Sequence, residues 1–170
     1  IAGTPELFLN TTTPLETPDD LEGLKIRTAG DDGVLLSRLG ASVVSMPPGD
    51  IYEAMQRGVI DAFQLNAPSV DVSAAMYEVC DYSYVSPARQ PTDYFSTMLN
   101  KDSWNDLPDD LKGVVEACLR QQVWDYLTFA TEADAEALVF YEDYGVVVEP
   151  APQAVVDALL EEAANFYEEK

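Results

Sequence analysis

The chain has 170 residues, and its 31 aspartates and glutamates against nine lysines and arginines give a net charge of −22. This charge excludes nucleic acids and anionic membrane surfaces as partners, because both are bound through basic faces. Histidine is absent, which excludes histidine-based catalysis and, with only two cysteines, argues against a zinc site. No run of 18 apolar residues occurs, so we expect no direct membrane insertion.

The first part of the chain alternates short apolar runs with amphipathic ones. Residues 4–10 are expected to be extended, and Thr17 followed by Pro18 is typical of a helix start. The next expected elements are strands at 24–28, 42–46 and 59–63 and helices at 32–39 and 50–57. This β-α-β-α-β order with short connections predicts an α/β fold with parallel strands and right-handed crossovers.

The second part of the chain is dominated by one long helix. Before it we expect a short helix up to about residue 75, strands at 82–85 and 94–100, and a turn at 104–107 capped by Ser103. The long helix is expected over 109–141, followed by a strand at 146–149 and a helix at 152–167. A helix of about 30 residues reaches ~45 Å, which favours a helix that crosses between two lobes.

Arg27 is the most informative cation of this acidic chain. It ends an apolar strand and precedes the turn Thr28-Ala29-Gly30. In open α/β sheets, ligands bind just outside the carboxyl ends of the strands. An arginine at that place can hold a carboxylate through two parallel hydrogen bonds. The alternative is a structural ion pair with Asp31, Asp32 or Asp61.

Further polar residues follow the neighbouring strands and converge on the same edge of the sheet. With Arg27, the candidate ligand-binding residues are Pro48, Gly49, Gln64, Leu65, Asn66, Arg89 and Gln90. Structural alternatives remain open, because Asn66 is suited to cap a helix, Gln64 to lie on the surface and Arg89 to pair with Asp93. The set indicates a receptor for a small carboxylate and not an enzyme.

The two cysteines, Cys80 and Cys118, are widely spaced in the sequence. We expect two buried thiols in preference to a disulfide. The cysteine count does not define the redox compartment.

Several segments resemble the solute-binding proteins of TRAP transporters, the dicarboxylate-binding-protein family. They are 22–27, 39–42, 49–62, 77–79, 99–101, 104–108 and 145–146. The resemblance covers nearly the whole chain. It implies a periplasmic or otherwise extracytoplasmic receptor with two α/β lobes, hinged by strands and a long helix. Such receptors close on an organic acid and deliver it to a membrane permease.

The resemblance also implies roles for individual residues. It identifies Arg27 as the arginine that clamps the carboxylate and 64–66 as the specificity segment. The spacing is similar to that of the branch that binds 2-oxo and hydroxy acids, in which two glutamates help to hold a metal cation. Here Gln64 and Gln90 stand at those positions, so we expect no cofactor and direct binding of the anion, with Arg89 nearby. A metal cation that bridges protein and ligand remains the alternative.

The same resemblance implies a division of the chain. Residues 4–92 and 133–170 correspond to the second ligand-binding lobe, and 93–132 to a strand and helix shared with the first lobe and the hinge. The rest of the first lobe has no counterpart here, so a fragment or a processed product is expected.

Two other functions remain as alternatives. A ligand-sensing domain of a signalling receptor would use the same site with a different output. A carboxylate-pair hydrolase is compatible with the abundance of acidic residues, but most of these lie in solvated helix patterns such as Glu161-Glu162.

Overall fold

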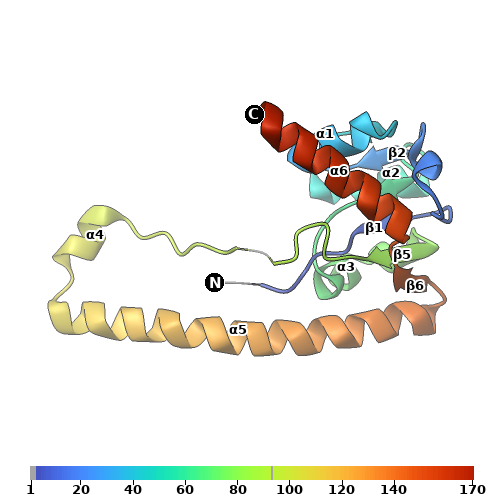
Figure 1. Cartoon of the computed structure of the whole chain (residues 1–170). Coiled ribbons are helices and arrows are strands. Elements are labelled where there is room, and N and C mark those ends of the chain that lie inside the picture. The colour runs from blue at the N-terminus through green and yellow to red at the C-terminus, as the bar shows by residue number, and fades with distance from the viewer. Residues whose placement is uncertain (1–2, 93) are drawn as a thin grey trace.

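The computed structural model describes residues 3–92 and 94–170, and its centre is a six-stranded sheet (Figure 1). In chain order the strands are β1 Leu9–Thr11, β2 Lys25–Arg27, β3 Ser42–Val44, β4 Ala62–Phe63, β5 Tyr82–Val85 and β6 Val147–Pro150. Their order in the sheet is β3-β2-β4-β1-β5-β6. Strand β2 is parallel to β3 and β4, β5 is parallel to β6, and β1 is antiparallel to both neighbours. The predicted α/β fold with a mostly parallel sheet is confirmed.

Helices cover both faces of this sheet. They are α1 Asp31–Arg38, α2 Ile51–Gln56, α3 Pro68–Ser73, α4 Lys101–Asp106, α5 Asp109–Tyr144 and α6 Gln153–Glu169, with 3₁₀ turns at Pro18–Leu21, Pro48–Asp50 and Met76–Glu78. Side chains of α1 and α6 form one core with Ala62 of β4. Side chains of α2 and α5 form a second core with Phe63, the next residue of β4. The division follows from the alternation of side chains along a strand.

The carboxyl ends of three strands meet beside the start of α1. In the register of the sheet, Arg27 at the end of β2 lies opposite Val44 of β3 and Phe63 of β4. The chain then turns through Gly30, whose φ of 70° favours glycine, and enters α1 at Asp31. The residues that follow β2 and β4 are therefore brought to one edge, as the sequence predicts.

Strand β1 inserts between the two parallel parts of the sheet, and the segment before it reaches the same edge. The N–H of Leu7 donates to the carbonyl oxygen of Asn66 (3.0 Å), and the N–H of Glu6 donates to that of Gln90 (3.2 Å). The segment before β1 is thereby hydrogen-bonded both to the residues after β4 and to the loop after β5.

The helix α5 has 36 residues and extends far beyond the sheet (Figure 1). Its buried residues lie in the second half, at Ala130, Asp134, Ala137 and Tyr141. The first half and the preceding segment expose large apolar side chains, among them Tyr94, Met98, Val114 and Trp124. Only the part of α5 next to the sheet therefore packs as a core helix.

Two local predictions are wrong. Residues 95–100 form no strand, and Tyr94 makes a single bridge, because this extended and exposed segment has no neighbouring strand to pair with. The expected turn at 104–107 is part of α4. Its cap is Asn100 and not Ser103, since the Asn100 side chain accepts the N–H groups of Asp102 and Ser103.

The two thiols are free and lie in different surroundings. Cys80 is buried, and burial raises the pKa of its thiol to about 12. Cys118 is exposed on α5, so the expectation that both thiols are buried is wrong for Cys118. Among the residues that the structure describes, no helix combines the length and apolar character needed to cross a bilayer.

Candidate functional site

A hollow of about 710 Å³ lies at the carboxyl ends of β2 and β4. It is lined by Glu6, Arg27, Ala29, Gly30, Asp31, Asp32, Pro48, Leu65, Asn66, Arg89, Gln90 and Tyr167. Six of the eight residues predicted for the site are in this set. Gln64 and Gly49 are not among its lining residues. The hollow is thus the natural candidate for the binding site.

Arg27 lines the hollow with a guanidinium that is held in place by backbone groups. Its Nε donates to the carbonyl oxygen of Met46 (3.2 Å), and its Nη1 donates to that of Gln64 (2.6 Å). The residue is 8% exposed. Neutral carbonyl oxygens orient the guanidinium but do not neutralise its charge.

No ion pair between described residues includes Arg27. Asp32 pairs with Arg89, Asp61 with Lys25 and Asp31 with Lys170, so the three aspartates considered as partners from the sequence are engaged elsewhere. Burial lowers the pKa of Arg27, and the charge of Arg89 lowers it further. The hollow therefore contains a positive charge without a carboxylate partner from the described parts of the chain.

Arg89 is also 8% exposed, but unlike Arg27 it forms ion pairs with carboxylates. Its Nη2 lies 2.5 Å from Glu6 Oε2, its Nε lies 3.2 Å from Asp32 Oδ2, and its Nη1 donates to the carbonyl oxygen of Leu7 (2.7 Å). These contacts tie the loop after β5 to the segment before β1 and to α1. The pair with Asp93 that the sequence suggested lies outside the described residues.

Gln64 is 2% exposed, so it is not a surface residue. Its Oε1 accepts the hydroxyl of Thr28 (2.5 Å), and its Nε2 donates to the carbonyl oxygen of Phe8 (2.9 Å). Both polar atoms of the side chain are thus engaged inside the protein, while its carbonyl oxygen positions Arg27. Gln64 therefore orients Arg27 without lining the hollow itself.

Leu65, Asn66 and Gln90 also line the hollow. Asn66 does not hold the capping position of α3, which Ala67 occupies, but its Oδ1 accepts the N–H of Ala67 (2.8 Å). Gln90 has a φ of 40°, a left-handed conformation that is uncommon for a residue with a side chain. Such strain is found in loops that are held in place by function or by neighbouring structure.

No group of three or more acidic or thiol side chains lies close enough together within the described ranges to hold a metal ion. The side chain of Gln64, which the sequence resemblance equates with a metal-binding glutamate, uses both polar atoms elsewhere. Gln64 is therefore not available as a metal ligand in this structure.

Six lining residues were not predicted from the sequence as parts of the site, and they are Glu6, Ala29, Gly30, Asp31, Asp32 and Tyr167. Glu6 reaches it through the segment before β1, and Asp32 through its contact with Arg89. Tyr167 comes from the last turn of α6, where its hydroxyl lies 3.3 Å from Asp31 Oδ2. These three contacts join residues 57 to 136 positions apart, and no local sequence pattern marks them.

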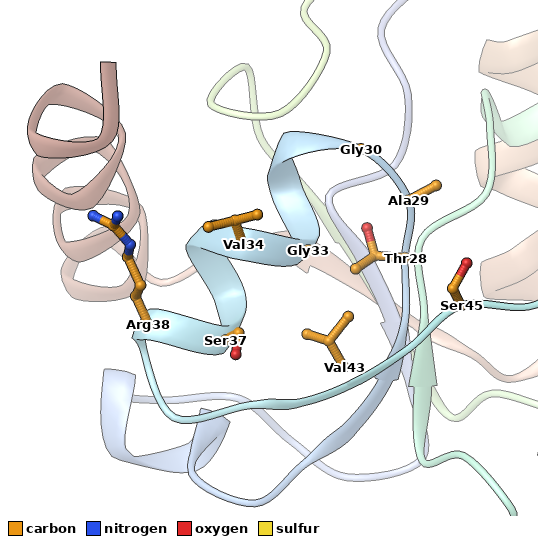
Figure 2. Close-up of a pocket in the computed structure, with 9 residues that line it drawn as sticks. All are labelled: Thr28, Ala29, Gly30, Gly33, Val34, Ser37, Arg38, Val43 and Ser45. Carbon is orange, nitrogen blue, oxygen red and sulfur yellow. The ribbon is translucent and has the colours of Figure 1, made fainter. Parts of the chain in front are cut away.

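A second hollow of about 530 Å³ lies over α1 and β3. Figure 2 shows Arg38 directed away from this hollow and toward the neighbouring helix, α6. There Arg38 pairs with Glu162 (3.5 Å) and Glu169 (2.7 Å). Arg38, the one cation among the described residues that line this hollow, is therefore neutralised by two carboxylates, so the hollow beside Arg27 is the better candidate for an anion site.

Comparisons with known proteins show the family to which the chain belongs. The sequence profile of the bacterial extracellular solute-binding proteins, family 7, matches residues 5–170. A monocarboxylate 2-oxoacid-binding periplasmic protein of Nostoc is 27% identical over 91% of this chain and 43% of its own length. The C4-dicarboxylate-binding periplasmic protein of Rhodobacter capsulatus is 31% identical over 81% of this chain and 41% of its own length.

A solved structure has the same fold. It is a TRAP periplasmic solute-binding protein of Colwellia psychrerythraea with bound calcium and pyruvate. It has a TM-score of 0.87 and 25% identity, over 99% of this chain and 52% of that one. The chain thus spans about half the length of the relatives it matches. It belongs to family 7 of the bacterial extracellular solute-binding proteins, as the sequence resemblance predicts.

Proposed function

We propose that the chain forms the carboxylate-binding lobe of a periplasmic TRAP-type receptor that captures a small organic acid. One observation carries the proposal: Arg27 is a buried, oriented guanidinium without a carboxylate partner among the described residues. A buried charge without a counter-ion is unfavourable, and an incoming carboxylate supplies that counter-ion. The fork of the guanidinium also matches the two oxygens of a carboxylate.

The ligand is a small acid of the 2-oxo, 2-hydroxy or dicarboxylic type. The relatives named above bind 2-oxo acids, C4-dicarboxylates and pyruvate, which share a carboxylate on a short polar chain. Asn66 and Gln90 offer amide groups beside Arg27 for the remaining oxygens. The anion binds directly, without a bridging metal ion, because Gln64 and Gln90 stand where glutamates would be needed. Binding is not followed by chemistry, so the protein is not an enzyme.

Residues 93–132 serve a first lobe and the hinge. The described residues of this region expose large apolar side chains, including Met98 (88%) and Trp124 (69%), which favours their contact with further protein. The relatives are about twice as long as this chain. Closure of two lobes around the acid then presents it to a permease in the membrane.

Calorimetric titration of the full-length protein tests the proposal. The probes are pyruvate, lactate and succinate, and methyl pyruvate serves as the matched control because it lacks the carboxylate. At least one acid is expected to bind with micromolar or tighter affinity, and methyl pyruvate is expected not to bind. Equal binding of pyruvate and its ester would contradict a carboxylate clamp, and conversion of a bound acid to product would contradict a receptor.

A further inference from the structure

A buried acid lies on α3, within electrostatic reach of Arg27 and Arg89. Asp71 is 0% exposed, and its Oδ2 accepts the side-chain N–H of Asn10 at 3.2 Å. Its Oδ1 has no hydrogen-bond partner among the described residues, and none of their ion pairs includes Asp71. The backbone N–H of Asn66 also favours the ionised form, but this donor and the Asn10 amide are neutral and are weak partners for a buried negative charge, so burial prevails and disfavours the ionised form.

The surroundings of Asp71 suit a protonated carboxyl group. Asn10 Oδ1, Ser83 Oγ and the Tyr141 hydroxyl are buried oxygens without a described partner. Asn10 lies directly opposite Ser83 across the β1–β5 pair, so both side chains are on the same face of the sheet as Asp71. A carboxylic acid can donate its proton to such oxygens, directly or through an enclosed water molecule, whereas a carboxylate cannot. Burial accordingly raises the pKa of Asp71 to about 8.

Asp71 is also in electrostatic contact with the candidate site. Its negative form is stabilised by Arg89 and destabilised by Glu6, and it in turn favours the charged form of Arg27. The titratable and charged groups that interact with it from the surrounding elements are Glu6, Arg27, Cys80, Arg89 and Tyr141. Asp134 of α5 contacts α3 at Ser69, two residues before Asp71. The arginines are shared between this acid and whatever anion enters the hollow.

We propose that Asp71 is a proton-binding site linked to the anion site, so that the receptor captures an organic anion together with a proton. This inference rests on the function proposed above. An anion beside Arg27 and Arg89 repels a negative charge on Asp71 and therefore favours its protonated form. Linkage is reciprocal, so loss of the proton from Asp71 weakens binding of the anion by the same factor.

The proposal fixes the form of the pH dependence. Affinity stays constant where Asp71 is protonated in the free protein, and it falls once the pH rises above the pKa of that carboxyl. If the bound anion raises the pKa of Asp71 by about one unit, the affinity falls about tenfold to a new plateau. The variant Asp71→Asn keeps a neutral side chain of the same shape, so its affinity is expected to stay at the value that the wild type has at low pH.

Calorimetry of the full-length protein from pH 6 to pH 10 tests the proposal with the same probes, pyruvate, lactate and succinate. Asp134→Asn is the matched control, because Asp134 is also buried but accepts the N–H of Ser69 (2.9 Å) and lines a different hollow. We expect wild type and Asp134→Asn to lose affinity above about pH 8, and Asp71→Asn to keep it. Titrations in two buffers of different ionisation heat should show proton uptake on binding by the wild type near pH 8.5.

The outcomes separate the two proposals. Binding without proton uptake, or with the same pH dependence in Asp71→Asn as in wild type, would overturn the proton linkage and leave the receptor function standing. Absence of binding by every probe at every pH would overturn both. Carboxyl NMR of the wild-type protein tests without a variant whether Asp71 is protonated in the free protein. A pKa of Asp71 near 4 would also overturn the linkage.

Discussion

Replacing Arg27 by alanine removes the only described guanidinium in the hollow that lacks a carboxylate partner. The bound acid then loses two charge-assisted hydrogen bonds, each of which contributes about 1.5–3 kcal/mol. A loss of about 3 kcal/mol or more corresponds to a dissociation constant weakened at least about 100-fold. Arg27→Lys keeps the charge but not the planar fork, so its affinity is expected to lie between those of alanine and wild type.

The same substitution is expected to change stability little. Alanine leaves the carbonyl oxygens of Met46 and Gln64 without their donors, a loss of about 1 kcal/mol for each hydrogen bond. It also removes a buried charge that has no counter-ion, which relieves a penalty of several kcal/mol for an ion taken out of water. The two effects oppose each other, so Tm should shift by only a few degrees.

Calorimetry for affinity and a thermal melt for stability separate the two roles of Arg27. The matched control is Arg57→Ala, which removes an exposed arginine paired only with Glu53 and should alter neither quantity. If Arg27→Ala lost much of its stability and kept its affinity, Arg27 would be a structural residue. The lack of a carboxylate partner would then not mark Arg27 as a ligand-binding residue.

Three further predictions concern the surroundings of the site. Arg89→Ala breaks a buried ion pair and is expected to destabilise the protein by about 3 kcal/mol in chemical denaturation; a change as small as that of Arg57→Ala would contradict this role. The pKa of Asp71 rises from its ordinary 3.8 to about 8 on folding, so stability falls with rising pH between these values, at most by about 1.4 kcal/mol per pH unit. Asp71→Asn should therefore gain stability over wild type from pH 5 to pH 8, and a constant difference would count against a raised pKa. Cys118 should react with a thiol reagent in the native protein, and Cys80 only after unfolding; early labelling of Cys80 would contradict its burial.

The parallel part of the fold was predictable because its signals are local. Each crossover from β2 to β4 is short, the helices α1 and α2 are each followed two residues later by a glycine, Gly40 or Gly58, and the apolar runs have the length of strands. From these signals Arg27 is predicted at the carboxyl end of β2 and Asn66 just after β4, and both are expected at the same edge of the sheet. Parallel topology makes that prediction possible because the ends of successive strands share an edge.

The remaining parts of the site depend on contacts that no local pattern encodes. Glu6 meets Arg89 only because β1 inserts antiparallel between β4 and β5. Gln64 seemed free to contact a ligand, yet its amide is used by Thr28 and Phe8. The extended run at 94–100 has the composition of a strand and lacks a neighbouring strand to pair with, and strand formation requires both.

A structure of the full-length protein with a bound acid tests the central claim most directly. With pyruvate or succinate in the hollow, two carboxylate oxygens are predicted at about 2.7–2.9 Å from nitrogens of the Arg27 guanidinium. The guanidinium should keep its contacts with the carbonyl oxygens of Met46 and Gln64. An acid bound elsewhere, with Arg27 in contact only with those two oxygens, would contradict the account.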